Sequence, residues 1–339
     1  MRNSLYFIGL TSLLFSCGSQ KPVQKVEAKP KTSITTNPTP KTPVPQKPQV
    51  KHEGSYDFYK TNIGDVSKND NTISYGSIVS AAPQGFRVVK DYFPAVAQNF
   101  RQKYIILHYT ALNDEKSVSV LTQQSVSSHY LVNNLGDKDI YQLVDENKRS
   151  YHAGISAWRN DKMLNDTSIG IEIVNPGYTT DASGAKIFPD FDEHQMKKVA
   201  ALVKDIATRY MIPPTNILAH SDIAPTRKQD PGPKFPWKKL YDEYQIGMWY
   251  DDASKDAFLN QANSEDFALQ QNTPQFIYKF QSALKTFGYD LAASGTIDDA
   301  TKKTIEAFQY HFRPQKYDGI MDAETWAILQ ALNQKYPNK

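Results

Sequence analysis

Short apolar runs bounded by polar residues recur through the middle of the chain. These runs are rich in β-branched and aromatic residues and predict strands over 104–109, 128–132, 140–144, 168–174 and 217–220. The run 168–174 alternates strictly, so that Ile169, Ile171 and Ile173 share one face and Glu172 lies on the other. A carboxylate beside a glycine on such a strand either faces solvent on an open sheet or lines a site.

One long helix is expected before the last of these strands. Apolar residues recur at helical spacing from Met196 to Tyr210. Asp190 and Glu193 fit a capping box at the start of this helix, and Pro213-Pro214 ends it. Strands mixed with a packed helix predict the α/β class, here a mixed central β-sheet flanked by helices.

The C-terminal part of the chain contains an internal repeat. The stretch Gly295–Thr301 (GTIDDAT) is echoed by Gly319–Thr325 (GIMDAET). Each glycine permits a turn, and the aspartate three residues before each threonine can cap a helix. Apolar residues at helical spacing surround both turns and predict a small all-α three-helix domain over 273–335. Residues 251–272 are expected to be a polar connector with some helix.

The first residues have the pattern of an export signal. Arg2 precedes an apolar stretch from Leu5 to Phe15, which is too short to span a bilayer. The sequence Leu14-Phe15-Ser16-Cys17 resembles a bacterial lipoprotein signal. This resemblance implies that residues 1–16 are removed and that Cys17 is the site of lipidation. An ordinary secretory signal with a chance cysteine is the alternative.

A proline- and lysine-rich segment follows the signal. Residues 21–50 contain seven prolines and six lysines but no aromatic residue, so they cannot bury enough surface to fold. We therefore expect a disordered tether over 17–52. Aromatic residues return after it, and residues 53–250 are expected to form a catalytic domain with an N-terminal extension and a core at about 100–245.

Composition limits the function classes that need consideration. The 39 basic and 36 acidic residues give a net charge of +3, which argues against a dedicated nucleic-acid binder. A single cysteine excludes an intramolecular disulfide and a Cys₄ metal site. No G-x-S-x-G motif supports a serine hydrolase. We expect a monomer.

Two histidines and one aspartate form the strongest chemical pattern. His108 and His220 lie at the ends of predicted strands, and Asp230 lies in a loop rich in proline and glycine. Two imidazoles and one carboxylate suit a catalytic zinc site, with Glu172 as a base and Lys228 as a cation for the oxyanion. From spacing alone, packed histidines, a turn at Asp230, or a nickel or iron site are also compatible.

Five segments give a specific resemblance that covers about 95–245. They are Leu107–Ala111, Ser127–Tyr130, Tyr151–Gly154, Asn165–Glu172 and His220–Pro233. In order and in content, they are similar to the zinc-dependent N-acetylmuramoyl-L-alanine amidases whose fold is shared with peptidoglycan recognition proteins.

The resemblance implies one Zn²⁺ per chain, held by His108, His220 and Asp230. It implies Glu172 as general base and Lys228 as the group that polarises the scissile carbonyl. The expected reaction is hydrolysis of the amide between N-acetylmuramic acid and L-alanine of the peptidoglycan stem peptide, in cell-wall turnover or recycling. A non-catalytic peptidoglycan-binding or sensing protein, and a zinc peptidase that cuts within the stem peptide, are the alternatives.

Three further residues are expected to bind substrate. His152 and Trp158 lie in and just after the segment that lines the substrate groove of this family, and Asn165 begins another matching segment. Local packing, or a turn in the case of Asn165, is the competing interpretation.

The C-terminal repeat resembles the peptidoglycan-binding three-helix module that is often attached to wall hydrolases. A stabilising cap without affinity for glycan is the alternative for this domain. The expected partners are therefore peptidoglycan and its muropeptides, and a membrane through the lipid anchor. The expected location is the cell envelope, in the outer membrane and facing the periplasm.

Overall fold

The computed structural model describes residues 83–87 and 99–338. The expected signal peptide, Cys17, the tether at 17–52 and most of the extension that follows lie outside these residues. Within the described ranges, no helix has the length and apolar character needed to cross a membrane.

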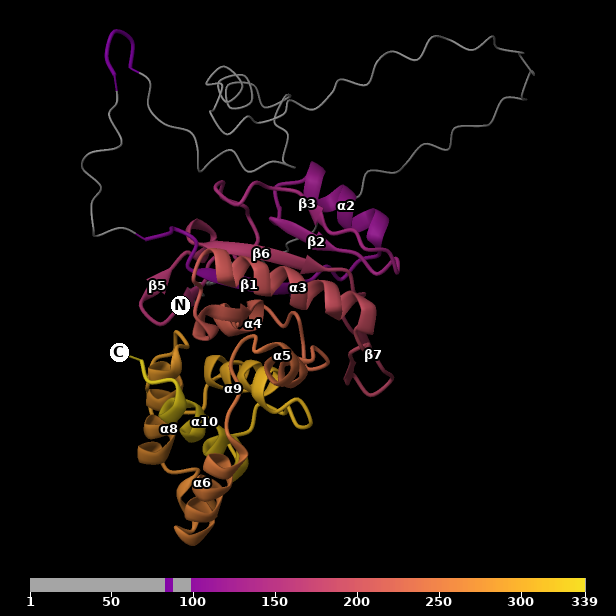
Figure 1. Ribbon diagram of the computed structural model, residues 1–339. Helices are drawn as coiled ribbons and strands as arrows, with labels where there is room; N and C mark the ends of the chain where they lie inside the picture. The colour runs from indigo at the N-terminus through magenta and orange to yellow at the C-terminus, as the bar shows by residue number, and fades with distance from the viewer. Residues whose placement is uncertain (1–82, 88–98, 339) are drawn as a thin grey trace, which may run out of the picture. The chain divides into compact units, whose positions relative to one another are not determined.

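A five-stranded mixed sheet forms the centre of the catalytic region (Figure 1). The strand order is β3-β2-β6-β1-β9, with β2, β6, β1 and β9 parallel and β3 antiparallel to β2. The strands are β1 (Tyr104–Tyr109), β2 (Tyr130–Val132), β3 (Tyr141–Gln142), β6 (Ser168–Ile173) and β9 (Ile217–Ala219). The mixed sheet predicted from the sequence is confirmed.

The remaining elements before residue 250 are short, apart from one helix. They are α2 (Asp114–Gln123), β4 (Ala157–Trp158), β5 (Asp161–Lys162), η2 (Leu164–Asp166), β7 (Thr179–Thr180), β8 (Lys186–Ile187), α3 (Glu193–Arg209), η3 (Pro214–Asn216), α4 (His220–Ile223) and α5 (Trp237–Tyr244).

The long helix α3 packs along the sheet (Figure 1). Its residues Val199, Val203 and Ile206 are fully buried in the same core as the isoleucines of β6. The predicted capping box at Asp190 is wrong, because the N-cap of α3 is Asp192, whose side chain accepts a hydrogen bond from the backbone N–H of Gln195. An aspartate at either position fits the sequence pattern, and the backbone geometry decides between them.

Five helices make up the C-terminal region. They are α6 (Asp252–Ser264), α7 (Phe267–Gln270), α8 (Pro274–Phe287), α9 (Asp299–Phe312) and α10 (Ala323–Lys335). The three helices expected from the repeat are α8, α9 and α10, and most of the expected connector is helical. Asp298 caps α9 and Asp322 caps α10, each by accepting from the backbone N–H of the threonine three residues later.

A buried glutamine supports each turn of the repeat. The side-chain amide of Gln281 donates to the carbonyl of Thr296, and that of Gln309 donates to the carbonyl of Ile320, at 2.8 and 3.0 Å. Their Oε1 atoms accept from the backbone N–H groups of Gly295 and Gly319. Both glutamines are fully buried, so these bonds explain why a polar residue follows a core phenylalanine in each repeat.

The C-terminal helices pack against the catalytic region. The ring of Trp158 lies edge-on to Phe287 and Tyr289, with centroid distances of 5.7 and 5.2 Å. The approach is so close that a Cβ at Gly288 would lie 2.6 Å from the Trp158 ring. The backbone N–H of Arg159 donates to the carbonyl of Gly288 at 2.7 Å. The two regions therefore share one continuous core.

Candidate functional site

The parallel pairing of the central strands assembles the site at their carboxyl ends. His108 on β1 is paired in register with Glu172 on β6. Strand β9 pairs with the other edge of β1 and ends at Ala219, so His220 follows directly after it. In open sheets with parallel strands, functional side chains gather at this edge because the connecting loops begin there.

His220 is the first residue of α4, which corrects the strand predicted over 217–220. The backbone N–H of Ala219 donates to Oδ2 of Asp222 at 2.8 Å and turns the chain into this short helix. The carboxylate three residues ahead competes with strand pairing, and the tertiary contacts of Asp222 favour the helical turn.

Two imidazole nitrogens and one carboxylate oxygen converge at the centre of the site. Nδ1 of His108, Nδ1 of His220 and Oδ2 of Asp230 lie 2.9 Å from one another. All three residues are buried, and their ligand atoms form a group that could hold a metal ion. Two histidines and one aspartate that leave a further position open form the donor set of a catalytic zinc site.

The second nitrogen of each of these histidines already has a partner. Nε2 of His220 lies 3.1 Å from the carbonyl oxygen of Ala153, and Nε2 of His108 lies 2.9 Å from Nδ1 of His152. Burial and the neighbouring His220 lower the pKa of His108 to about 4, so its ring is neutral at pH 7. Burial opposes ionisation of Asp230, but the two imidazoles outweigh it and hold the pKa of this carboxyl well below its usual range. Neutral imidazole and ionised carboxylate are the forms that bind a metal, so these residues fit zinc.

A pocket of about 240 Å³ opens onto the three donors. Glu172 and Lys228 line it together with the three donors, so the structure brings together all five residues singled out in the sequence. Oε2 of Glu172 is buried and has no hydrogen-bond partner among the described residues. Burial and the nearby Asp230 carboxylate raise the pKa of Glu172 well above its usual value. A buried carboxyl with a raised pKa in a pocket is suited to act as a general base.

The three residues predicted to bind substrate lie in different places. His152 lines the pocket but is 8% exposed and sits behind His108. Trp158 is fully buried, donates from Nε1 to the carbonyl of Thr215, and packs on the C-terminal helices. Asn165 is buried, and its Oδ1 accepts from the backbone N–H groups of His152 and Ala153. These contacts correct the expected substrate roles of Trp158 and Asn165, because neither side chain reaches the pocket.

Sequence reasoning missed helix α2, which forms an apolar wall of the pocket. Val120 and Leu121 of this helix line the pocket, and Tyr151, which is 55% exposed, is also part of its lining. Asn113 caps α2 by accepting from the backbone N–H of Lys116, and two acidic residues follow in the first turn. That capping pattern was the available signal for the helix.

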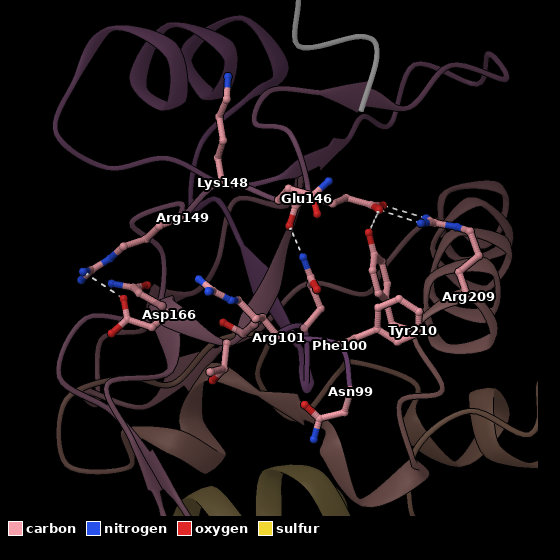
Figure 2. Close-up of a pocket in the computed structure, with 14 residues that line it drawn as sticks. Asn99, Phe100, Arg101, Glu146, Lys148, Arg149, Asp166, Arg209 and Tyr210 are labelled. Carbon is pink, nitrogen blue, oxygen red and sulfur yellow. Dashed lines mark hydrogen bonds and ion pairs between the residues drawn. The ribbon is translucent and has the colours of Figure 1, made fainter. Parts of the chain in front are cut away.

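A larger cavity of about 860 Å³ lies at the opposite end of the sheet (Figure 2). Its lining includes Thr167 and Ser168, which precede and begin β6, and Arg101, which precedes β1. Figure 2 shows Arg209 turned toward Glu146 and Arg149 turned toward Asp166, and both are ion pairs. The residues that line it include no histidine, so the convergent donor set belongs to the smaller pocket.

Two segments of the chain match known protein families, and one of these segments contains the site. Residues 98–233 match the family described as N-acetylmuramoyl-L-alanine amidase. Residues 273–329 match the family described as "Putative peptidoglycan binding domain".

Individual relatives extend the agreement over most of the chain. The chain is 43% identical to the N-acetylmuramoyl-L-alanine amidase AmiD of Escherichia coli over 70% of this chain and 84% of that protein. It is 37% identical to the 1,6-anhydro-N-acetylmuramyl-L-alanine amidase AmpD of Enterobacter cloacae over 31% of this chain and 51% of that protein.

Solved structures of amidases are also similar to most of this chain. AmiD of E. coli in complex with the substrate anhydro-N-acetylmuramic acid-L-Ala-D-γ-Glu-L-Lys aligns at a TM-score of 0.67 and 40% identity, over 75% of this chain and 97% of that chain. AmpDh3 of Pseudomonas aeruginosa in complex with an anhydromuramic pentapeptide aligns at a TM-score of 0.65 and 40% identity, over 75% of this chain and all of that chain. With the site geometry, these likenesses show that the chain belongs to the N-acetylmuramoyl-L-alanine amidase family.

Proposed function

We propose that this chain is a zinc-dependent amidase that releases the stem peptide from N-acetylmuramic acid, with His108, His220 and Asp230 as zinc ligands. The observation that carries the proposal is the convergence of these three donors in a pocket that also contains Glu172 and Lys228. Zinc bound there would act as a Lewis acid and lower the pKa of a water ligand to ~7.

Glu172 is suited to move the proton during hydrolysis. Glu172 lines the pocket from the strand next to His108, and its buried Oε2 has no partner among the described residues, so the carboxyl can take a proton from the attacking water. The same carboxyl then delivers this proton to the amide nitrogen as the bond to L-alanine breaks. Its raised pKa matches this exchange because the protonated form is accessible in the buried site.

Lys228 is suited to stabilise the charge that develops on the scissile carbonyl. It lies two residues before Asp230 and lines the same pocket. As water adds to the carbonyl carbon, the oxygen becomes anionic, and a donor fixed nearby lowers the barrier because it needs no reorganisation. Binding alone requires no such pair of base and cation, so the pair favours an enzyme over a sensing protein.

We further propose that the substrates are muropeptides, including those that end in 1,6-anhydromuramic acid. The solved complexes of AmiD and AmpDh3 contain anhydromuramic peptides, and this chain aligns with nearly the whole of both. We also propose that residues 273–335 hold the enzyme on peptidoglycan, since most of this range matches a peptidoglycan-binding family.

The proposed location is the cell envelope, in the outer membrane and facing the periplasm. The apolar stretch from Leu5 to Phe15, followed by Ser16 and Cys17, supports lipidation of that cysteine, and the proline-rich segment that follows would serve as a tether between membrane and wall. Radioactive palmitate incorporation that is lost in Cys17→Ala tests this part of the proposal.

Digestion of purified muropeptides by the full chain in detergent tests the activity. Mass spectrometry of the products is expected to show an intact stem peptide that begins with L-alanine. A chelator should stop its release, and added zinc should restore it. A shortened stem peptide would instead indicate a peptidase, and no cleavage by a folded, zinc-loaded protein would indicate a binding protein.

A further inference from the structure

A chain of hydrogen bonds runs from the sheet to the back of His108. Nε2 of His108 lies 2.9 Å from Nδ1 of His152, and Nε2 of His152 lies 3.1 Å from Oγ of Ser168. The Ser168 hydroxyl donates in turn to the carbonyl oxygen of Leu164 at 2.5 Å. All of these side chains are buried, so no solvent competes for the bonds.

The carbonyl of Leu164, where this series of hydrogen bonds ends, sets the direction of every hydrogen bond in the series. A carbonyl oxygen only accepts, so the single hydroxyl hydrogen of Ser168 points toward Leu164. Oγ of Ser168 must then accept from Nε2–H of His152, which leaves Nδ1 of His152 as an acceptor. Nε2–H of His108 therefore donates to it, and Nδ1 of His108 keeps its lone pair toward His220 and Asp230.

The same segment of chain orients the second histidine. Ala153, next to His152, offers its carbonyl oxygen to Nε2–H of His220 at 3.1 Å. This bond leaves Nδ1 of His220 with its lone pair toward Asp230. Oδ1 of Asn165 accepts from the backbone N–H groups of His152 and Ala153 and so fixes the segment at 3.1 and 2.7 Å.

The sheet makes room for the His152 ring at one residue. Gly170 lies on β6 beneath this ring, and a Cβ at that position would lie 2.4 Å from Cγ of His152. A side chain there would expel the ring, so the glycine next to Ile169 and Ile171 is explained by the imidazole that covers it.

We propose that His152 is a positioning residue for the metal site rather than a substrate contact, and that Ser168 fixes its tautomer. In this role His152 holds the His108 ring with the Nδ1 lone pair directed at the zinc position. This inference rests on the proposed function, because it presumes that zinc is the ligand of His108, His220 and Asp230. Outer partners of this kind typically change metal affinity by about 10–100-fold when removed.

Two nearly isosteric substitutions separate hydrogen bonding from packing. In His152→Asn, Oδ1 can take the place of Nδ1 and still accept from His108, whereas His152→Leu fills similar space without an acceptor. We expect His152→Leu to weaken zinc binding by about 10–100-fold and His152→Asn to retain most of the affinity. The affinity is measured on the full chain in detergent by competition with a fluorescent zinc chelator. Equal zinc affinities in the two variants would overturn the proposal.

A second measurement does not need zinc or a fold-sensitive variant. Nitrogen-15 NMR of the metal-free protein is expected to show His152 as the Nε2–H tautomer, because Ser168 and the Leu164 carbonyl fix it whether or not zinc is bound, and Ser168→Ala is expected to mix its tautomers. An Nδ1–H tautomer at His152 in the unsubstituted protein would overturn the inference. If the unsubstituted protein shows the Nε2–H tautomer but fails to bind zinc, the proposed zinc function fails and the hydrogen-bond assignment stands.

Discussion

Nδ1 of His311 lies 2.7 Å from Oδ2 of Asp222, and both side chains are fully buried. His311 belongs to α9 in the C-terminal region, and Asp222 belongs to α4, two residues after His220. Oδ1 of the same aspartate accepts from the hydroxyl of Tyr289 at 2.7 Å. The C-terminal region therefore supplies two of the groups that hold the short helix in which His220 lies, one from α9 and one from the loop that follows α8.

Removal of the Tyr289 hydroxyl should destabilise the protein measurably. Tyr289→Phe leaves a buried carboxylate oxygen without a donor, and hydrogen bonds to charged groups contribute about 1.5–3 kcal/mol to the free energy of unfolding. We expect a loss in that range, measured by chemical denaturation. Tyr278→Phe is the control, since the Tyr278 side chain is 55% exposed. Equal stability of the two variants would show that the contact with Asp222 is unimportant.

His108→Ala should abolish tight zinc binding together with turnover. The substitution removes one of three buried donors, and the remaining imidazole and carboxylate cannot complete a catalytic zinc site. Zinc content of the purified protein, measured by elemental analysis, checks this expectation. His194→Ala is the matched control, because His194 lies on the exposed start of α3. Full zinc content in His108→Ala would remove His108 from the site.

Glu172→Gln should separate chemistry from metal binding. The amide fills the same space but cannot take up a proton, and general-base catalysis contributes about 10²–10⁴-fold to a rate. We expect turnover of muropeptides to fall by that factor while zinc content stays unchanged. Glu115→Gln on the exposed surface of α2 should keep full turnover. Normal turnover of Glu172→Gln would place the base elsewhere.

Lys228→Met should lower kcat with a smaller effect on zinc affinity. The substitution keeps much of the side-chain volume but removes the donor proposed for the oxyanion, and loss of such a donor costs about 10²–10³-fold in kcat. Steady-state kinetics on one muropeptide gives kcat and KM separately. A rise in KM at constant kcat would show that Lys228 only binds the substrate.

Glu146 should make the free energy of unfolding depend on pH in the acid range. Burial disfavours ionisation of this carboxyl, but hydrogen bonds from Arg209, Tyr130 and Tyr210 outweigh it and lower its pKa. A lowered pKa in the folded state stabilises the fold at pH values above the pKa of the unfolded carboxyl, which is about 4.3. This stabilisation is lost as the pH falls through the pKa that Glu146 has in the folded state.

The variant Glu146→Gln isolates this contribution to stability. The difference in free energy of unfolding between the unsubstituted protein and this variant should be largest near pH 7. It should shrink below about pH 4.3, where the unfolded carboxyl becomes protonated. Urea denaturation at several pH values measures it, and a difference that stays constant down to pH 3 would contradict the assignment.

Local pattern alone determined much of the fold. The alternation of Ile169, Ile171 and Ile173 predicts β6 because only a period of two places all three on one buried face. Asp298 and Asp322 predict the starts of α9 and α10 because capping is a contact between residues three positions apart. Such features need no knowledge of distant parts of the chain.

Tertiary structure alone decided what each side chain of the site faces. The family motifs single out His152 and Trp158, but packing places one behind His108 and the other against Phe287 and Tyr289. The donating nitrogen of each histidine depends on carbonyl groups at Ala153 and Leu164, which are far from His108 and His220 in sequence. Sequence supplies the residue types, whereas the direction of a hydrogen bond depends on partners that only the folded chain brings together.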